Sequence, residues 1–133
     1  MAVSAAQLAF AQELFEGLAG LSSRRMFGGV GLYAQGVMFG LVDDDVIYLK
    51  TDAALRESLG AEGSRSWIFT AGKGPKAGQP QETSYWSLPE AALDDAEEAR
   101  QWAERALAVA LAAQANRPER KPRERVAKRR ARP

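Results

Sequence analysis

Residues 24–50 decide the fold of this chain, and they read RRMFGGVGLYAQGVMFGLVDDDVIYLK. The stretch contains three runs rich in β-branched and aromatic residues, at positions 30–34, 37–42 and 46–50. The segments between the runs are only two or three residues long, and a crossover between parallel strands needs a dozen or more. The three runs are therefore predicted to form an antiparallel meander.

The segment that precedes the meander is predicted to be a helix over residues 4–19. Ser4 and Gln7 have the spacing of a capping box, and apolar residues recur every three or four positions. Gly20 supplies a C-terminal stop.

The second half of the chain is predicted to add two helices and two strands. A short helix follows the meander, with Asp52 as its N-cap and Gly60 at its end. The last helix begins with a capping box formed by Asp94 and Glu97. The predicted ranges are 53–59 and 95–114 for the helices and 67–71 and 82–87 for the strands. The order α-β(3)-α-β(2)-α predicts a two-layer α+β fold, with an antiparallel sheet and helices packed on one face.

The end of the last helix, ALAVALAA at residues 106–113, is apolar on every side. A helix of this kind needs cover on more than one side, which the sheet and a second subunit would provide. We therefore expect a homodimer that uses this helix or a sheet edge. The alternative is that alanine, a strong helix former, is simply tolerated at the surface.

Composition and charge divide the chain of 133 residues into a domain at 1–115 and a basic tail at 116–133. The length suits one domain with one core, and we predict a cytoplasmic protein without a signal peptide or a membrane-spanning segment. The tail carries nine Lys or Arg and two Glu, whereas the domain carries nine basic and fifteen acidic residues. The chain is thus an acidic body followed by a cationic segment.

The tail is predicted to be disordered and to attract nucleic acid without reading its sequence, because cationic arms bind polyanions through counterion release. A purely solubilising tail is the alternative. The candidate nucleic-acid-binding residues are Arg117, Arg120, Lys121, Arg123, Arg125, Lys128, Arg129, Arg130 and Arg132.

The chain lacks the residues of the commonest catalytic and metal sites. It contains no histidine and no cysteine, so the usual general base of serine and cysteine nucleophiles and the common transition-metal ligands are missing. A buried carboxylate pair would need no motif, but the acidic run at 43–45 is interpreted as a solvated turn. We predict no enzyme, no catalytic residues, no cofactor and no metal.

The glycines at the start of the meander are interpreted as structural. Residues 29–34 match G-x-G-x-x-A, but no helix N-terminus follows them, as dinucleotide binding requires. We expect Gly28 and Gly29 to permit a bulge, or a close backbone approach where the first helix crosses the strand.

The four residues that precede these glycines are candidates for recognition. Arg24 and Arg25 are adjacent, so on a strand they point to opposite faces and at most one faces a given surface. An ion pair for one arginine and solvent for the other is the structural alternative. Met26 and Phe27 are expected in the core more than in a recognition surface.

Four short motifs resemble the N-terminal domain of the TfoX/Sxy family of bacterial competence regulators. They are Arg-Met-Phe-Gly-Gly at 25–29, Gly-Val-Met-Phe at 36–39, Tyr-Leu-Lys at 48–50 and Tyr-Trp-x-Leu-Pro at 85–89. The resemblance covers about residues 10–110 and implies a secretion-chaperone-like fold. It also implies a regulator of DNA-uptake gene transcription that works beside a DNA-bound activator and has no known catalytic residues.

Together, the residues and the resemblance predict a regulatory module that binds a protein partner, with possible non-specific nucleic-acid contact through the tail. The alternative is a small-ligand or protein-binding scaffold that resembles a chaperone. The candidate partner or ligand-binding residues are Arg24, Arg25, Met26, Phe27, Gly28, Gly29, Tyr33, Lys50 and Tyr85.

Overall fold

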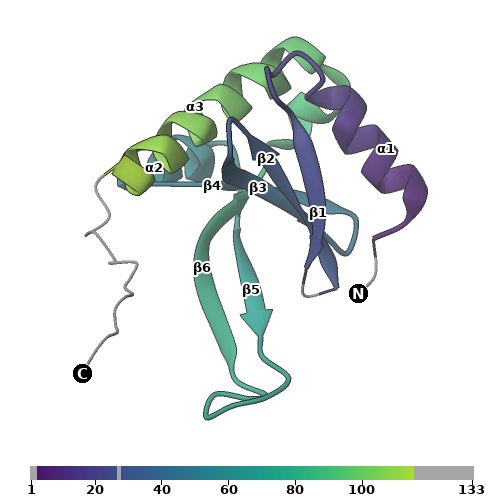
Figure 1. Cartoon of the computed structure of the whole chain (residues 1–133). Coiled ribbons are helices and arrows are strands. Elements are labelled where there is room, and N and C mark those ends of the chain that lie inside the picture. The colour runs from purple at the N-terminus through teal and green to yellow at the C-terminus, as the bar shows by residue number, and fades with distance from the viewer. Residues whose placement is uncertain (1–2, 27, 116–133) are drawn as a thin grey trace, which may run out of the picture.

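The computed structural model describes residues 3–26 and 28–115 as an antiparallel sheet with helices on one face (Figure 1). The strands are β1 (Ser22–Met26), β2 (Gly29–Ala34), β3 (Val37–Asp43), β4 (Val46–Lys50), β5 (Ser66–Thr70) and β6 (Pro80–Ser87). The helices are α1 (Ala5–Leu14), α2 (Ala53–Ala61), the short 3₁₀ helix η1 (Glu90–Asp94) and α3 (Ala96–Ala115).

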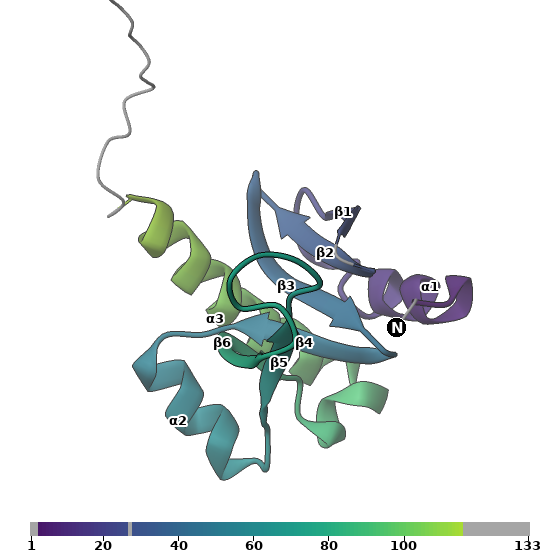
Figure 2. The same ribbon diagram turned by 90° about the horizontal axis from the view of Figure 1, so that it is seen from below.

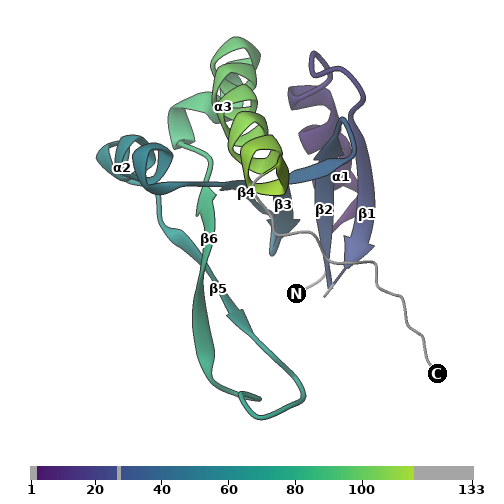
Figure 3. The same cartoon turned by 60° about the vertical axis from the view of Figure 1, so that its left-hand side comes forward.

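The six strands have the spatial order β1-β2-β3-β4-β6-β5, and all neighbouring pairs are antiparallel. α1, α2 and α3 lie on one side of the sheet, while the β5–β6 hairpin extends away from the helical layer (Figure 3). The predicted α+β class and antiparallel sheet are confirmed. The predicted order of elements lacked one strand, because β1 extends the meander by pairing with β2.

The tight turns of the meander use left-handed backbone at residues with short or flexible side chains. Gln35 and Gly36 have φ of 53° and 82°, and Asp44 and Asp45 have φ of 52° and 65°. Two consecutive residues with positive φ match the right-handed twist of a hairpin. These turns fix β2, β3 and β4 as neighbours, as the sequence predicts.

Side-chain caps begin the helices, although some boundaries differ from the prediction. Ser4 accepts from the backbone N–H of Gln7 at 3.0 Å, and Asp52 accepts from that of Leu55 at 2.9 Å, as expected. α3 is capped one residue later than predicted, because Asp95 rather than Asp94 accepts from the N–H of Glu98.

Two helix ends also differ. α1 ends at Leu14, and the chain then turns before Gly20 takes a φ of 75°. α2 runs past Gly60 to Ala61, and the left-handed residue after it is Gly63, with φ 90°. Gly63, and not Gly60, therefore supplies the left-handed residue that follows the helix end.

The core fills the space between the helices and the covered face of the sheet. Phe15 and Phe39 are fully buried and meet edge to face, with ring centroids 5.7 Å apart. α3 presents a buried alanine stripe to β3 and β4, formed by Ala99, Ala103, Ala106 and Ala110. Small side chains at this spacing let the helix lie close to the sheet. On the other side of the apolar segment of α3, Leu111 is 36 % exposed.

A β-bulge in β3 sets which side chains reach the other face. Tyr33 pairs with Met38 and Leu32 pairs with Gly40, so Phe39 is the extra residue. A bulge shifts the inward and outward alternation by one position. Phe39 and Val42 therefore both point into the core, whereas Met38 and Leu41 point to the opposite face.

Candidate functional site

The sheet face without helices carries a cluster of aromatic and methionine side chains. We call it the open face, and it is seen from below in Figure 2, where the β5–β6 hairpin rises toward the viewer. Leu41 is only 4 % exposed yet lies outside the main core cluster. Leu41 lines a pocket on this face, so the open face has a packed apolar surface of its own.

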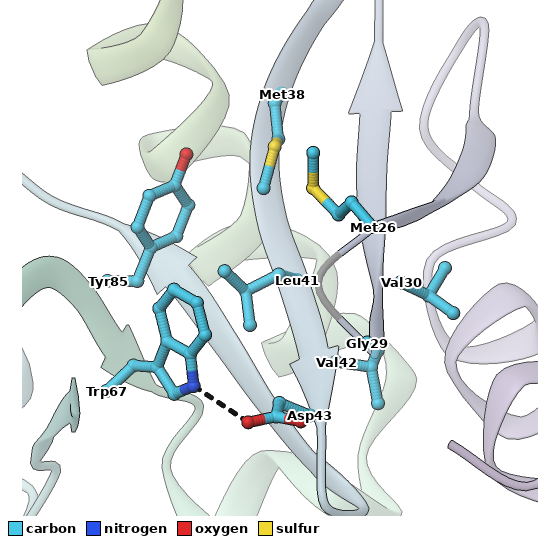
Figure 4. A pocket seen from close by; sticks show the side chains of 9 residues that line it. All are labelled: Met26, Gly29, Val30, Met38, Leu41, Val42, Asp43, Trp67 and Tyr85. Atoms are coloured by element: carbon cyan, nitrogen blue, oxygen red, sulfur yellow. Dashed lines mark hydrogen bonds between the residues drawn. The ribbon is translucent and has the colours of Figure 1, made fainter. Parts of the chain in front are cut away.

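A pocket of about 240 Å³ lies where the hairpin bends over the meander (Figure 4). Trp67 and Tyr85 stand on the hairpin side, Met26 and Met38 on the meander side, and Leu41 lies between them. The complete lining is Met26, Gly29, Val30, Met38, Leu41, Val42, Asp43, Trp67 and Tyr85. The pocket is thus apolar, apart from one carboxylate at its end.

Trp67 is the centre of an aromatic cluster that joins β5 to β4 and β6. Its ring centroid lies 5.4 Å from that of Phe69, 6.3 Å from Tyr48 and 6.4 Å from Tyr85. Aromatic pairs at these separations attract each other beyond their area burial. They hold the hairpin against the meander and so shape the pocket.

A hydrogen bond fixes the indole of Trp67. Its Nε1–H donates to Oδ2 of Asp43 at 2.9 Å (Figure 4). The interpretation of residues 43–45 as a solvated turn is therefore wrong for Asp43, which is half-buried, and holds for Asp44 and Asp45, which are exposed. The hydrogen bond crosses 24 positions of sequence, so no local pattern announces it.

Two cations flank the pocket on aromatic rings. The guanidinium carbon of Arg24 lies 5.5 Å from the ring centroid of Tyr33, and Nζ of Lys50 lies 5.3 Å from that of Tyr85. Both distances suit cation–π attraction. Lys50 also donates to Oγ of Ser84 at 3.3 Å. The ion pair considered for one of the arginines is not formed by Arg24 or Arg25 within residues 3–26 and 28–115.

The glycines serve close approaches within the sheet. A Cβ on Gly29 would lie 2.5 Å from the carbonyl oxygen of Val42 in β3, so the backbone that approaches it belongs to the sheet and not to the first helix. The expected approach to that helix is therefore wrong. A Cβ on Gly31 would meet the sulfur atoms of Met26 and Met38 at 3.0 and 3.3 Å. Gly31 thus leaves room for the methionines of the pocket.

The phenols of the open face favour their neutral form. Burial raises the pKa of Tyr48, with a smaller contribution from the charges of Asp43 and Asp44. Burial also raises the pKa of Tyr85, helped by Tyr33. Lys50 lies over the ring face of Tyr85, with Nζ 5.3 Å from the ring centroid.

Within residues 3–26 and 28–115, no group of three or more acidic side chains could hold a metal ion. No helix there is long and apolar enough to cross a membrane.

The model of the TfoX N-terminal domain family matches residues 13–110 of this chain. The chain belongs to this family. A search of curated proteins found no match. Membership in the TfoX N-terminal domain family suggests a regulatory role.

This TfoX N-terminal domain brings together most of the residues predicted as its site. Met26, Gly29 and Tyr85 line the pocket, and Arg24, Tyr33 and Lys50 flank it. Met26 is therefore part of the open face and not of the main core, contrary to the expectation for it.

The remaining predicted residues lie elsewhere. Arg25 alternates with Arg24 and shares the face of Ser23, whose Oγ accepts from Gln12 of α1, so Arg25 points to the helix side. Gly28 is exposed in the β1–β2 turn, with φ 81°. Phe27 and the nine basic tail residues lie outside the described residues.

Six lining residues of the pocket were not predicted as site residues: Val30, Met38, Leu41, Val42, Asp43 and Trp67. Tyr48, which packs against Trp67, was not predicted as a site residue either. Alternation in the strands would have found Tyr48 from Lys50, since the two share a face. The bulge at Phe39 hid Met38 and Leu41, because strict alternation places them on different faces.

Proposed function

We propose that this chain is a non-enzymatic regulatory module that binds a protein partner on its open face. The carrying observation is the apolar pocket between Trp67, Tyr85 and the two methionines, flanked by the cations of Arg24 and Lys50. Tryptophan, tyrosine and arginine are the residues most enriched in the energetic centres of protein interfaces. Methionine adapts its shape to different apolar partners.

The size of the pocket favours a single side chain as its occupant. Pockets for cofactors and drug-sized ligands measure roughly 300–1,000 Å³, and a cavity of about 150 Å³ holds benzene. At about 240 Å³, this pocket suits one aromatic or large aliphatic group. A protein segment can insert such a group and use the surrounding open face for the rest of its contact.

The charges at the pocket favour acidic residues beside that anchor. Arg24 and Lys50 each present a cation over a tyrosine ring, and such cations can pair with carboxylates of a bound segment. We therefore propose a partner segment with one large apolar residue flanked by Asp or Glu.

The process in which this partner acts is proposed from the family and the tail. TfoX/Sxy regulators act in transcription of DNA-uptake genes, so the partner we propose is a protein of the transcription apparatus in the cytoplasm. The basic residues at 117–132 would add non-specific attraction to DNA. Deletion of residues 117–133 should weaken DNA binding and flatten its salt dependence, and an unchanged affinity across a salt series would remove this part of the proposal.

The partner proposal is tested by pull-down from the native cytoplasm with the full chain, with and without nuclease. Met38→Glu places a carboxylate in the pocket beside apolar groups and should abolish nuclease-resistant capture. Phe10→Glu is the matched control, since Phe10 lies on α1 in the helical layer, is 36 % exposed and does not line the pocket. Equal capture by both variants would exclude the pocket as the partner site.

A small apolar ligand is the second candidate, favoured by the apolar lining of the same pocket. It would shift the NMR resonances of Met26, Met38 and Trp67 when a metabolite library is added. A shift with a low-molecular-weight compound at micromolar concentration would favour this reading over a protein partner.

A further inference from the structure

The two edge strands of the sheet differ in chemistry. β1 carries Arg24 and Arg25 side by side, and charged side chains of this kind protect an edge against pairing with another chain. β5, with the sequence SWIFT, carries no charge, and its central Ile68 is 47 % exposed. Among the described strands, β5 pairs with β6 alone. The β5 edge therefore lacks the usual protection.

The sequence of β5 is self-complementary in antiparallel orientation. If Ile68 lies opposite Ile68 of a second copy, Trp67 lies opposite Phe69 and Ser66 lies opposite Thr70. These are an aliphatic pair, two aromatic pairs and two hydroxyl pairs, which are favourable cross-strand combinations. Arg65 would lie opposite Ala71, so no like charges meet along the strand.

The faces of β5 agree with this register. Trp67 and Phe69 have ring centroids 5.4 Å apart within one chain, so both lie on the open face and Ile68 points to the other side. The register shift between β5 and β6 lies between Ser66 and Ile68, where two steps along β5 correspond to four along β6. The extra residues therefore belong to β6, and no residue is inserted into β5.

We propose that β5 pairs with β5 of a second copy about a two-fold axis at Ile68, which joins two sheets into one continuous sheet. The contact is isologous, so it closes after two copies. It places the Trp67–Phe69 pairs of both copies together on the open face. The dimer thus carries two pockets on one extended surface, and it goes beyond the partner binding proposed above.

A first test measures the monomer–dimer equilibrium of the full chain by analytical ultracentrifugation over a concentration series. Ile68→Lys places two ammonium groups opposite each other and should raise the dissociation constant by about tenfold or more. Val46→Lys is the control at a similarly exposed residue and should leave the constant unchanged. Native-like far-UV circular dichroism and cooperative thermal unfolding would show that both variants fold.

The same experiment separates β5 from the last helix as the interface. Leu111→Lys alters the exposed side of α3 and should not affect the dimer. A chain that stays monomeric at millimolar concentration would overturn the proposal. So would a dimer that Leu111→Lys dissociates and Ile68→Lys does not.

A second test reads the register with single cysteines, since the natural chain has none. Directly opposite residues have Cα atoms about 4.5–5.5 Å apart, which suits a disulfide. Ile68→Cys alone should therefore form a covalent dimer on mild oxidation. Ser66→Cys and Thr70→Cys should not cross-link separately, but their mixture should give the heterodimer. Cross-linking of Thr70→Cys alone would contradict the register.

Discussion

The two faces of the sheet are built from the same strands but from different kinds of side chain. The covered face carries Phe39, leucines and valines against the alanine stripe of α3, and these side chains are almost fully buried. The open face carries tyrosine, tryptophan and methionine, with a cation at each of two rings. Neighbouring residues of one strand therefore belong to the main core on one face and to the aromatic cluster and its pocket on the other.

The difference follows from what water can reach. On the covered face, a polar group would lose its hydrogen bonds to water, so the largest fully buried side chains that the strands present there are leucine, valine and phenylalanine. On the open face, tyrosine and tryptophan keep a polar tip while their rings pack together. The aromatic open face can therefore stay exposed in the monomer and still offer apolar area to a partner.

The largest expected effect is on the covered face, at Phe39. Phe39→Ala removes a fully buried ring that meets Phe15, and it should lower the free energy of unfolding by about 3–5 kcal/mol. Met38→Ala, one position away on the open face, should cost less than half of this because Met38 is half-buried. Urea denaturation measures both, and equal losses would contradict the division between the faces.

A smaller effect is expected from two glycines of β2. Gly29→Ala places a Cβ 2.5 Å from the Val42 carbonyl oxygen, where the backbone must move, and we expect a loss of about 1–3 kcal/mol. Gly31→Ala meets the flexible ends of Met26 and Met38, so it should cost less stability but disturb the pocket. Thermal unfolding measures the loss of stability, and partner capture measures the disturbance of the pocket. A larger loss of stability for Gly31→Ala than for Gly29→Ala would contradict this distinction between the two glycines.

A still smaller effect is confined to alkaline pH. Because burial raises the pKa of Tyr48 and Tyr85 in the folded chain, the unfolded chain loses these protons first as the pH rises past about 10. The contribution of these two phenols to stability is thus fully present below that pH. It is lost as the pH rises through their pKa values in the folded chain. The Tyr48→Phe, Tyr85→Phe double variant should lose less stability between pH 8 and 11 in urea denaturation. An equal loss would place the cause outside the open face.

The smallest effect on stability is expected at the adjacent arginines. Arg24→Ala and Arg25→Ala are surface changes and should each alter the free energy of unfolding by less than about 0.5 kcal/mol. Arg24→Ala removes the cation that we propose to pair with a partner carboxylate, and it should weaken partner binding about two- to fivefold, as expected for an exposed ion pair. Arg25→Ala should leave binding unchanged, and a loss with Arg25→Ala instead would move the site to the helix side.

Local signals explain the parts of the fold that the sequence predicted. The Gln35-Gly36 turn, the caps at Ser4 and Asp52 and the alternation in β4 act over a few residues, so they are readable from the chain. β1 was missed because Ser-Ser-Arg-Arg-Met has little strand preference of its own, and its strand conformation comes from pairing with β2.

The candidate site was predicted only in part, because most of its contacts join residues that lie far apart in the sequence. The resemblance indicated Met26, Gly29, Lys50 and Tyr85, which the structure brings to one face. Nothing in the sequence near Trp67 indicated that its indole donates to Asp43, or that it packs against Tyr48 and Tyr85. Those contacts exist because the β5–β6 hairpin folds back toward the meander.

The sequence by itself determined the meander, the helices around it and the family, because turns, caps and periodicity depend on near neighbours. Only the tertiary structure decided which face each side chain occupies after the bulge at Phe39, and which residues meet in the pocket. Those outcomes depend on strand pairing and packing between distant segments, whose free energy is gained only when the whole sheet has formed.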